Sequence, residues 1–186
     1  MPILTKSRKK QDAITKKSKD ITTYYNGIAS GYDQLYELEQ QQKIQAFRND
    51  IHINKSTKIL DVGCGTGIST QFSCKAVGID PSQKLITLAQ QKNTNPLVMF
   101  ICERAENISQ LKFNSKEFDY CLCISAVHHF SKLPLILKEI HRISKNSIIS
   151  ILHKAQKKEY IMACITKEFK VIKTINERKD VILILE

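Results

Sequence analysis

The fold of this chain is decided by the stretch Ile59-Leu60-Asp61-Val62-Gly63-Cys64-Gly65-Thr66-Gly67. A short apolar run ends in a carboxylate, and three glycines follow at every second position. A second apolar run, Ala76-Val77-Gly78-Ile79-Asp80, also ends in an acid. This order predicts a strand, a glycine turn, a helix and a second strand tipped with Asp, which together form a pocket for a ligand that carries a nucleoside.

Apolar runs of strand length recur along the chain, at residues 58–62, 76–80, 97–102, 118–125, 147–152, 169–175 and 180–185. Helical patterns separate most of them, which predicts an α/β, Rossmann-like fold with a doubly wound, seven-stranded and mostly parallel sheet. Ser82 is expected to cap one helix and Ser131 another, and the second helix presents Leu133, Ile136, Leu137 and Ile140 on one face. Residues 176–180 are too few for a crossover helix, so the last two runs are expected to form an antiparallel hairpin.

The length of 186 residues fits one domain. Residues 1–20 lack an apolar period and carry seven basic and two acidic groups, so we interpret them as a basic flexible arm. Residues 21–186 form the expected domain, which begins with a helix from Ile21 to about Asp50. No apolar run approaches the length of a membrane span.

The six cysteines show no disulfide pattern, and no histidine lies at ligand spacing beside Cys121 and Cys123. We therefore expect neither a disulfide nor a metal site, and the reducing cytoplasm as the location. Cys102, Cys121 and Cys123 fall in apolar runs, where cysteine acts as a small hydrophobe.

The formal net charge of +11 raises the question of a nucleic-acid partner. The excess is concentrated in residues 1–20 and residues 145–186, whereas the middle of the chain is nearly balanced. Only five of the 29 basic residues are Arg, the side chain favoured for bidentate phosphate contacts. RNA therefore remains an alternative partner, and a solubilising role of the arm is the competing interpretation.

Three types of nucleotide loop compete for the glycine motif. A P-loop needs a Lys after its last glycine, but Ile68 follows Gly67. A dinucleotide fingerprint would need Gly at position 68, and Asp61 would place a negative charge beside the pyrophosphate. Asp61 instead suits a ligand with a positive group, and Asp80 can accept both hydroxyls of a ribose. A positive charge and a ribose without phosphate describe S-adenosylmethionine.

The chain resembles the class I S-adenosylmethionine-dependent methyltransferases, in particular small members similar to the quinone-biosynthesis and archaeal branch. The resemblance runs from about Tyr24 to the C-terminus and rests on four segments in order: Tyr24–Asp33, Leu60–Gly67, Gly78–Ser82 and Phe118–Phe130. It implies S-adenosylmethionine as cofactor and a sheet that ends in a hairpin, in agreement with the pattern above.

The resemblance also implies roles for individual residues. Asp61 and the backbone of Gly63, Cys64, Gly65, Thr66 and Gly67 hold the methionine portion, and Asp80 holds the ribose. The segment 102–106 faces the adenine; because Arg104 stands where the family commonly has Asp, Glu106 or a backbone carbonyl accepts from the adenine amino group. The other expected cofactor-binding residues are Tyr25, Tyr32, Pro81, Ala105 and Ser125.

Structural roles compete with these assignments. Asp61 could be a structural acid, Asp80 could cap the helix after Pro81, and the tyrosines could belong to the core. His128 and His129 follow the fourth strand, where one of them could take a proton from the methyl acceptor or orient it. The competing interpretation is that one packs against the cofactor and the other lies in a loop.

Family members that methylate amides or exocyclic amines often carry an Asn-Pro-Pro-Tyr-type turn where this chain has Ser125-Ala126-Val127-His128. The sequence therefore favours a small-molecule acceptor that is methylated on oxygen, carbon or a carboxylate. Two alternatives stay open: a tRNA or other RNA methyltransferase, and a non-catalytic binding subunit with this fold. The absence of a long inserted cap near the C-terminus favours an open site or one that an activating protein partner completes.

Overall fold

The computed structural model describes residues 21–186, so the predicted basic arm, residues 1–20, lies outside the described residues. Residues 21–28 are helical, and a 3-10 turn at Ala29–Gly31 separates them from helix α2 (Tyr32–Phe47). The helix predicted from Ile21 to about Asp50 is therefore interrupted, and a second 3-10 turn at Arg48–Asp50 follows α2. None of the described helices is long and apolar enough to cross a membrane.

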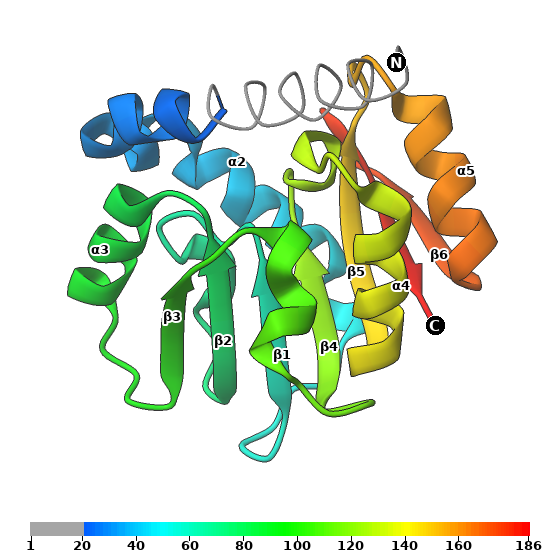
Figure 1. The fold of residues 1–186 in the computed structure, drawn as a ribbon, viewed down its shortest axis with the longest axis horizontal. Helices are drawn as coiled ribbons and strands as arrows, with labels where there is room; N and C mark the ends of the chain where they lie inside the picture. Colours follow the sequence, from blue (N-terminus) through cyan, green and yellow to red (C-terminus); the bar gives the residue numbers. More distant parts are fainter. Residues whose placement is uncertain (1–20) are drawn as a thin grey trace, which may run out of the picture.

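Seven strands form one sheet in the order β3-β2-β1-β4-β5-β7-β6 (Figure 1). Their bounds are β1 Lys58–Val62, β2 Lys75–Asp80, β3 Val98–Cys102, β4 Phe118–Cys123, β5 Ser144–Leu152, β6 Val171–Asn176 and β7 Asp180–Leu185. The first five pair in parallel, whereas β7 pairs antiparallel with both β5 and β6. The predicted seven-stranded sheet and its terminal hairpin are confirmed.

Helices cover both faces of this sheet, because the central strands are apolar on both sides. Helix α4 (Leu133–Ile143), helix α5 (Lys158–Glu168) and the 3-10 turn Ala105–Leu111 cover one face, where Leu60 and Val62 point. The end of α2 covers the other, where Phe47 packs with Ile59. Helix α3 (Gln83–Lys92) lies against β2 and β3 (Figure 1).

The two predicted helix caps have different outcomes. Ser82 caps α3, because its hydroxyl accepts from the backbone N–H of Leu85 at 3.3 Å. The predicted cap at Ser131 is wrong: α4 begins at Leu133 after Lys132, without a side-chain cap. The N–H and the hydroxyl of Ser131 both donate to Glu106 instead, so that the hydroxyl is turned away from the helix.

The apolar face predicted for α4 is buried, and Lys138 and Arg142 are exposed as expected. Among the cysteines in apolar strands, Cys121 and Cys123 are buried, whereas Cys102 is exposed because β3 is an edge strand. Strand β4 ends at Cys123, two residues before the expected end, because Ser125 adopts a positive φ of 57° that no strand contains.

Candidate functional site

A cavity of about 340 Å³ lies across the carboxyl ends of β2, β1, β4 and β5. In open α/β sheets, ligands bind at the carboxyl ends of the strands, at the point where the strand order reverses. Here that point is β1, because β2 lies on one side of it and β4 on the other. The volume of the cavity falls at the lower end of the range of about 300 to 1,000 Å³ for small-molecule sites. The topology therefore places the candidate site where the sequence predicts it.

Glycine is required in the loop after β1, as Gly63 and Gly65 illustrate. Gly63 has φ +84°, and a Cβ there would lie 2.4 Å from the Cβ of Ala126. Gly65 has φ +56°, and a Cβ there would lie 3.1 Å from the hydroxyl oxygen of Tyr32. Positive φ and close approach both exclude larger residues without rearrangement. The loop thus brings its backbone up against the turn after β4 and the start of α2.

Asp61 is fully buried beneath this loop. Its Oδ2 accepts hydrogen bonds from the hydroxyls of Ser69 and Thr70, each at 2.7 Å, whereas its Oδ1 is buried without a partner. Burial raises the pKa of Asp61 to about 6, although the hydrogen bonds from the two hydroxyls lower it. The charge of Asp80 raises it further. A buried carboxylate oxygen without a donor is costly. It fits a ligand that brings an N–H or a positive charge.

Asp80 lines the cavity at the tip of β2. One oxygen accepts from the backbone N–H of Ser82 at 2.8 Å and the other from that of Gly65 at 3.1 Å. Burial nevertheless raises its pKa to about 6. Each carboxylate oxygen keeps a further lone pair, so Asp80 can still accept from ligand hydroxyls. Asp80 thus fits the predicted ribose contact and also organises the start of the α3 segment.

Tyr25 and Tyr32 both line the cavity and pack edge to face, with ring centroids 6.1 Å apart. Burial raises the pKa of Tyr25 to about 12 and that of Tyr32 further, so both hydroxyls stay protonated near neutral pH. Two contacts hold their segment in place: Asn26 Oδ1 accepts from Ser82 Oγ at 2.7 Å, and Asp33 accepts from Thr66 Oγ1 at 2.5 Å. Asp33 also pairs with Lys92.

Ala105, Glu106 and Arg104 line the cavity after β3. Glu106 Oε1 accepts from the N–H of Ser131 at 2.9 Å and from its hydroxyl at 2.7 Å. Burial alone would raise the pKa of Glu106, but the Ser131 hydrogen bonds and the nearby Arg104 outweigh it and the pKa is lowered. The sequence could not reveal that Ser131 is the partner of Glu106. Because Glu106 is engaged in this way, a backbone carbonyl of the same segment is the freer acceptor for an adenine amino group.

His128 and His129 lie in a 3-10 turn, Val127–His129, and both line the cavity. The Nδ1 of His128 is buried without a partner. Burial, assisted by the charge of Lys43, lowers the pKa of His128 to about 4, so its imidazole is neutral at pH 7. His129 differs, because its Nε2 lies 3.1 Å from the hydroxyl of Tyr25. The two histidines are therefore not equivalent.

Ser125 completes the predicted set. It lines the cavity at the end of β4, and the N–H of Ser125 donates to the hydroxyl of Ser150 on β5 at 2.8 Å. Pro81 and Gly63 also line the cavity, whereas Asp61, Cys64, Gly65, Thr66 and Gly67 lie outside its wall. Those five residues form or support the loop behind it: the Gly67 N–H donates to the Cys64 carbonyl at 2.9 Å, for example.

Tyr24, which begins the first segment of the resemblance, also lines the cavity. Sequence reasoning missed several other residues in the cavity wall: Tyr36, Glu39, Gln40, Ile124 and Leu152. The sequence could have indicated Tyr36, Glu39 and Gln40, because they follow Tyr32 at helical spacing and therefore share its face of α2. No such signal pointed to Leu152, whose place in the wall depends on how the sheet is ordered. Within residues 21–186, no group of three His, Cys, Asp or Glu side chains is arranged to hold a metal ion.

Residues 60–151 match the family model described as "Methyltransferase domain". This segment is a methyltransferase domain, similar to those of the class I S-adenosylmethionine-dependent methyltransferases. The chain is 30% identical over 124 residues to the ubiquinone biosynthesis O-methyltransferase of Pelagibacter ubique, covering 62% of this chain and 50% of that protein. It is 29% identical to the uncharacterized protein MJ1252 of Methanocaldococcus jannaschii, covering 70% and 50%. The chain spans about half the length of these curated relatives.

Solved structures show the same methyltransferase fold at low identity. One is magnesium protoporphyrin IX methyltransferase from Synechocystis with bound S-adenosylmethionine, with a TM-score of 0.72, 17% identity and coverage of 91% of this chain and 96% of that one. Another is a chain of the complex between the Haloferax volcanii Trm112 methyltransferase activator and a methyltransferase. Its TM-score is 0.72 at 13% identity, with coverage of 87% and 96%. These likenesses establish the fold.

Proposed function

We propose that this chain transfers a methyl group from S-adenosylmethionine to a small-molecule acceptor, on oxygen, carbon or a carboxylate. One observation carries the proposal. The buried Oδ1 of Asp61 has no partner and lies beneath the glycine loop. The loop is hydrogen-bonded through Gly65 to Asp80, which lines the cavity. A cationic group and a ribose are the two ligand features that these acids suit, as the sequence predicts.

Each part of the cofactor has its own residues in this proposal. Asp61 and the backbone of Gly63–Gly67 hold the methionine portion, Asp80 with Pro81 holds the ribose, and the Ala105–Glu106 segment faces the adenine. Ser125 borders the reacting end of the cofactor, and Tyr25 and Tyr32 cover it, which excludes water from the site. When bound, S-adenosylmethionine supplies a methyl group activated by its sulfonium. The protein's main task is then alignment of the acceptor.

The acceptor end of the cavity lies toward β4 and β5. Ser125, His128 and Leu152 line it from the sheet, and Tyr36 and Glu39 line it from α2. His128 lines the cavity, and its neutral imidazole can accept a proton or a hydrogen bond from an acceptor hydroxyl. The O-methyltransferase name of one relative supports an oxygen acceptor. A quinone-like or other aromatic acceptor would pack against the tyrosines.

The first test is cofactor binding. S-adenosylmethionine at ten times its dissociation constant should stabilise the folded protein by about 1.4 kcal/mol, read as a rise of the thermal midpoint. The Asp61→Ala variant should lose this rise. Labelled-methyl transfer into fractionated small-molecule, protein and RNA pools then identifies the acceptor. Absence of both a midpoint shift and any transfer would refute the proposal and favour a non-catalytic binding subunit.

RNA is a second candidate acceptor, which a surface groove beside the cavity favours. This groove shares Ala105 and Glu106 with the cavity and is lined by four basic side chains, Lys116, Lys132, Lys138 and Arg142, among acidic ones. RNA binding that weakens steeply with salt, and that weakens further in Lys132→Ala and Lys138→Ala variants, would support it. Binding independent of salt would remove it.

An activating protein partner is a further part of the proposal, because a similar chain occurs in a complex with a methyltransferase activator. The purified chain and the activator protein of the same cells should form a 1:1 complex, whose mass by light scattering equals the sum of one copy of each. The complex should transfer methyl groups faster than the chain alone. Equal rates with and without the activator would exclude this part.

A further inference from the structure

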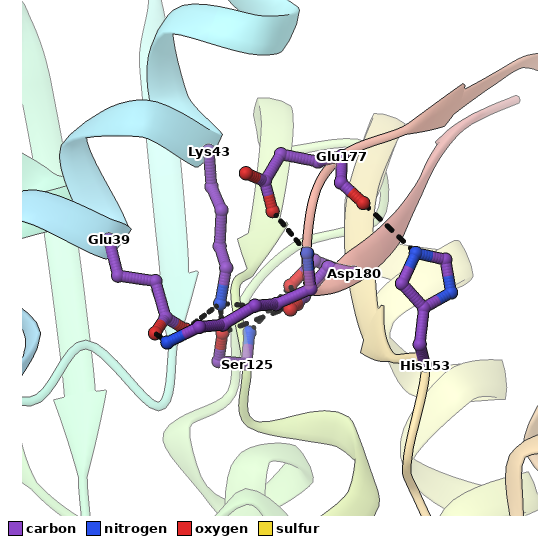
Figure 2. Close-up of polar contacts among 8 residues, drawn as sticks. Glu39, Lys43, Ser125, His153, Glu177 and Asp180 are labelled. Atoms are coloured by element: carbon purple, nitrogen blue, oxygen red, sulfur yellow. Dashed lines mark hydrogen bonds and ion pairs between the residues drawn. The ribbon is translucent and has the colours of Figure 1, made fainter.

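A buried ion pair lies behind Glu39 and Ser125, two residues that line the cavity. Figure 2 shows the pair and its partners. Lys43 on α2 and Asp180 at the start of β7 are both fully buried, and Lys43 Nζ lies 3.0 Å from Asp180 Oδ1. The same Nζ donates to Glu39 Oε1 at 2.7 Å and to Ser125 Oγ at 2.6 Å. The ammonium group therefore donates two hydrogen bonds and forms an ion pair with Asp180, whose Oδ1 has no hydrogen-bond partner.

A second set of contacts closes the network from the sheet side. The hydroxyl of Ser150 donates to Asp180 Oδ2 at 2.7 Å and accepts from the N–H of Ser125 at 2.8 Å. The Ser125 hydroxyl also approaches Asp180 Oδ2 at 3.4 Å. On the solvent side, Lys179 pairs with Glu39. The network thus joins α2, the end of β4, β5 and the turn before β7, elements that are distant in the sequence (Figure 2).

Stability alone is a weak reason for such a pair. Desolvation of a buried ion pair offsets most of its attraction, and apolar residues of similar volume often serve as well. The position of the network is more informative, because two of its members, Glu39 and Ser125, line the cavity. Lys43 itself lies behind them and outside the cavity wall.

Ser125 is held in a backbone conformation that serine rarely adopts. Its φ is 57°, in the left-handed region that favours glycine. Such conformations persist where the surroundings over-determine them, typically at functional sites. Here the Ser150 hydroxyl holds the N–H of Ser125 and Lys43 holds its Oγ. Three residues later the chain presents His128 to the cavity.

We propose that Lys43 is a positioning residue of the methyl-transfer site: by holding the Ser125 hydroxyl it fixes the left-handed turn after β4 and, through it, the place of His128. The inference rests on the proposed function for the role of His128 in methyl transfer. That Lys43 fixes the position of His128 does not depend on the proposed function. Lys43 does not touch the cavity contents and acts through Ser125.

Electrostatics gives the network a second effect on His128. The charged and titratable groups around this turn are Lys43, Glu39 and Tyr36 from α2, Asp180 from β7, Tyr25 from the helical residues 21–28, and His129 from the turn itself. Burial and the Lys43 charge keep the pKa of His128 low. Without the ammonium group, two carboxylates remain and the imidazolium form becomes more favourable.

The main test compares Lys43→Met with Lys92→Met. Both substitutions remove an ion pair of α2, but Lys92 pairs with Asp33 and makes no contact with Ser125. The His128 imidazole is followed by NMR titration, assigned with His128→Gln. We expect the His128 midpoint to rise by at least about one pH unit in Lys43→Met and to stay in place in Lys92→Met. We expect kcat to fall about 100-fold in Lys43→Met, with little change in the KM for S-adenosylmethionine.

A second variant tests whether Lys43 acts through Ser125. Glycine adopts a positive φ without being held, so in a Ser125→Gly background Lys43→Met should cause a smaller fold-loss of kcat and a smaller shift of His128. Equal effects in both backgrounds, or an unchanged His128 midpoint in Lys43→Met, would overturn the proposal. If Lys43→Met does not fold, Lys43→Met/Asp180→Asn removes both buried charges and is measured in its place.

The two proposals fail differently. Wild-type protein that neither binds S-adenosylmethionine nor transfers a methyl group would refute the proposed function. The His128 titration and its dependence on Ser125 would still decide the role of Lys43, since neither needs cofactor or acceptor. Conversely, an active enzyme whose His128 midpoint ignores Lys43→Met would refute only the positioning role.

Discussion

The backbone N–H of Gly65 donates to a carboxylate oxygen of Asp80 at 3.1 Å, which ties the glycine loop after β1 to the tip of β2. This bond fixes the loop and the ribose-facing acid relative to each other before any ligand arrives. It also brings Asp80 close to buried Asp61, and each acid has a pKa raised to about 6. The site therefore contains two carboxyl groups that titrate just below neutral pH.

Affinity for S-adenosylmethionine should consequently depend on pH. A cation favours ionised carboxylates, and both groups become protonated as the pH falls through about 6. We expect the dissociation constant to be at least about tenfold weaker at pH 5 than at pH 7, measured by calorimetry. Adenosine, which lacks the charged methionine portion, serves as the control and should show a weaker dependence. The same affinity at both pH values would contradict the assignment of Asp61.

Asp61 should also influence stability with a defined sign. Its pKa is raised from 3.8 to about 6 in the folded state, so its charged form opposes folding and its contribution worsens as the pH rises from 3.8 to 6. Relative to wild type, the free energy of unfolding of Asp61→Asn should increase by up to about 3 kcal/mol between pH 4 and pH 7. Urea unfolding without cofactor at several pH values measures this difference.

The matched control for this experiment is Asp119→Asn. Asp119 pairs with Lys145 at the surface, and its pKa is lowered because the Lys145 and Lys58 contacts outweigh desolvation. A lowered carboxyl pKa contributes stability that appears as the pH rises, so this variant should become relatively less stable from low to neutral pH. Opposite slopes for the two variants are expected. Parallel slopes would show that Asp61 is not buried in its charged form.

Gly63→Ala should destabilise the protein by about 2 kcal/mol or more, because the new methyl group would lie 2.4 Å from the Ala126 Cβ and φ is positive. Gly27→Ala is the matched control. Gly27 lies in the helical residues 21–28, and no atom stands within 4 Å of its added Cβ. That variant should be neutral or slightly more stable in thermal unfolding. Equal destabilisation by both would argue against a tight loop at Gly63.

The two histidines should separate kinetically. His128→Ala should lower kcat by about 100-fold or more if His128 takes a proton from the acceptor, with little change in cofactor KM. His129→Phe removes the contact with Tyr25 and should mainly raise the KM for S-adenosylmethionine, since Tyr25 belongs to the cover. Steady-state kinetics with the identified acceptor measures both. A His128→Ala variant with unchanged kcat would leave His128 a packing role.

Most of the sheet could be predicted from the sequence because its signals are local. Each strand is an apolar run, the glycine loop marks one turn, and the short link before Asp180 permits only a hairpin. The Asp61 and Asp80 positions follow from the same runs. Ser82 could be predicted as a cap because its partner, the N–H of Leu85, lies three residues away.

Features that depend on distant partners could not be predicted. Ser131 looks like a helix cap in sequence, yet in the fold its N–H and its hydroxyl both donate to Glu106, a carboxylate that arrives from another segment. Lys43 falls among polar residues of α2 and carries no sign that Asp180 will bury it. Side-chain partners of this kind are decided by packing between elements, which periodicity does not encode.

The two ends of the cavity have different origins along the chain. Apart from Tyr25, Tyr32 and Ser125, the residues of the proposed cofactor end fall in one block between Asp61 and Glu106. The acceptor end instead combines α2, the turn after β4, Leu152 and the supporting Asp180. Exchanges at these scattered positions would change the acceptor end and leave the donor block unaltered. Kinship with a named methyltransferase, such as the ubiquinone relative, is therefore a guide to the donor and a poor guide to the recipient.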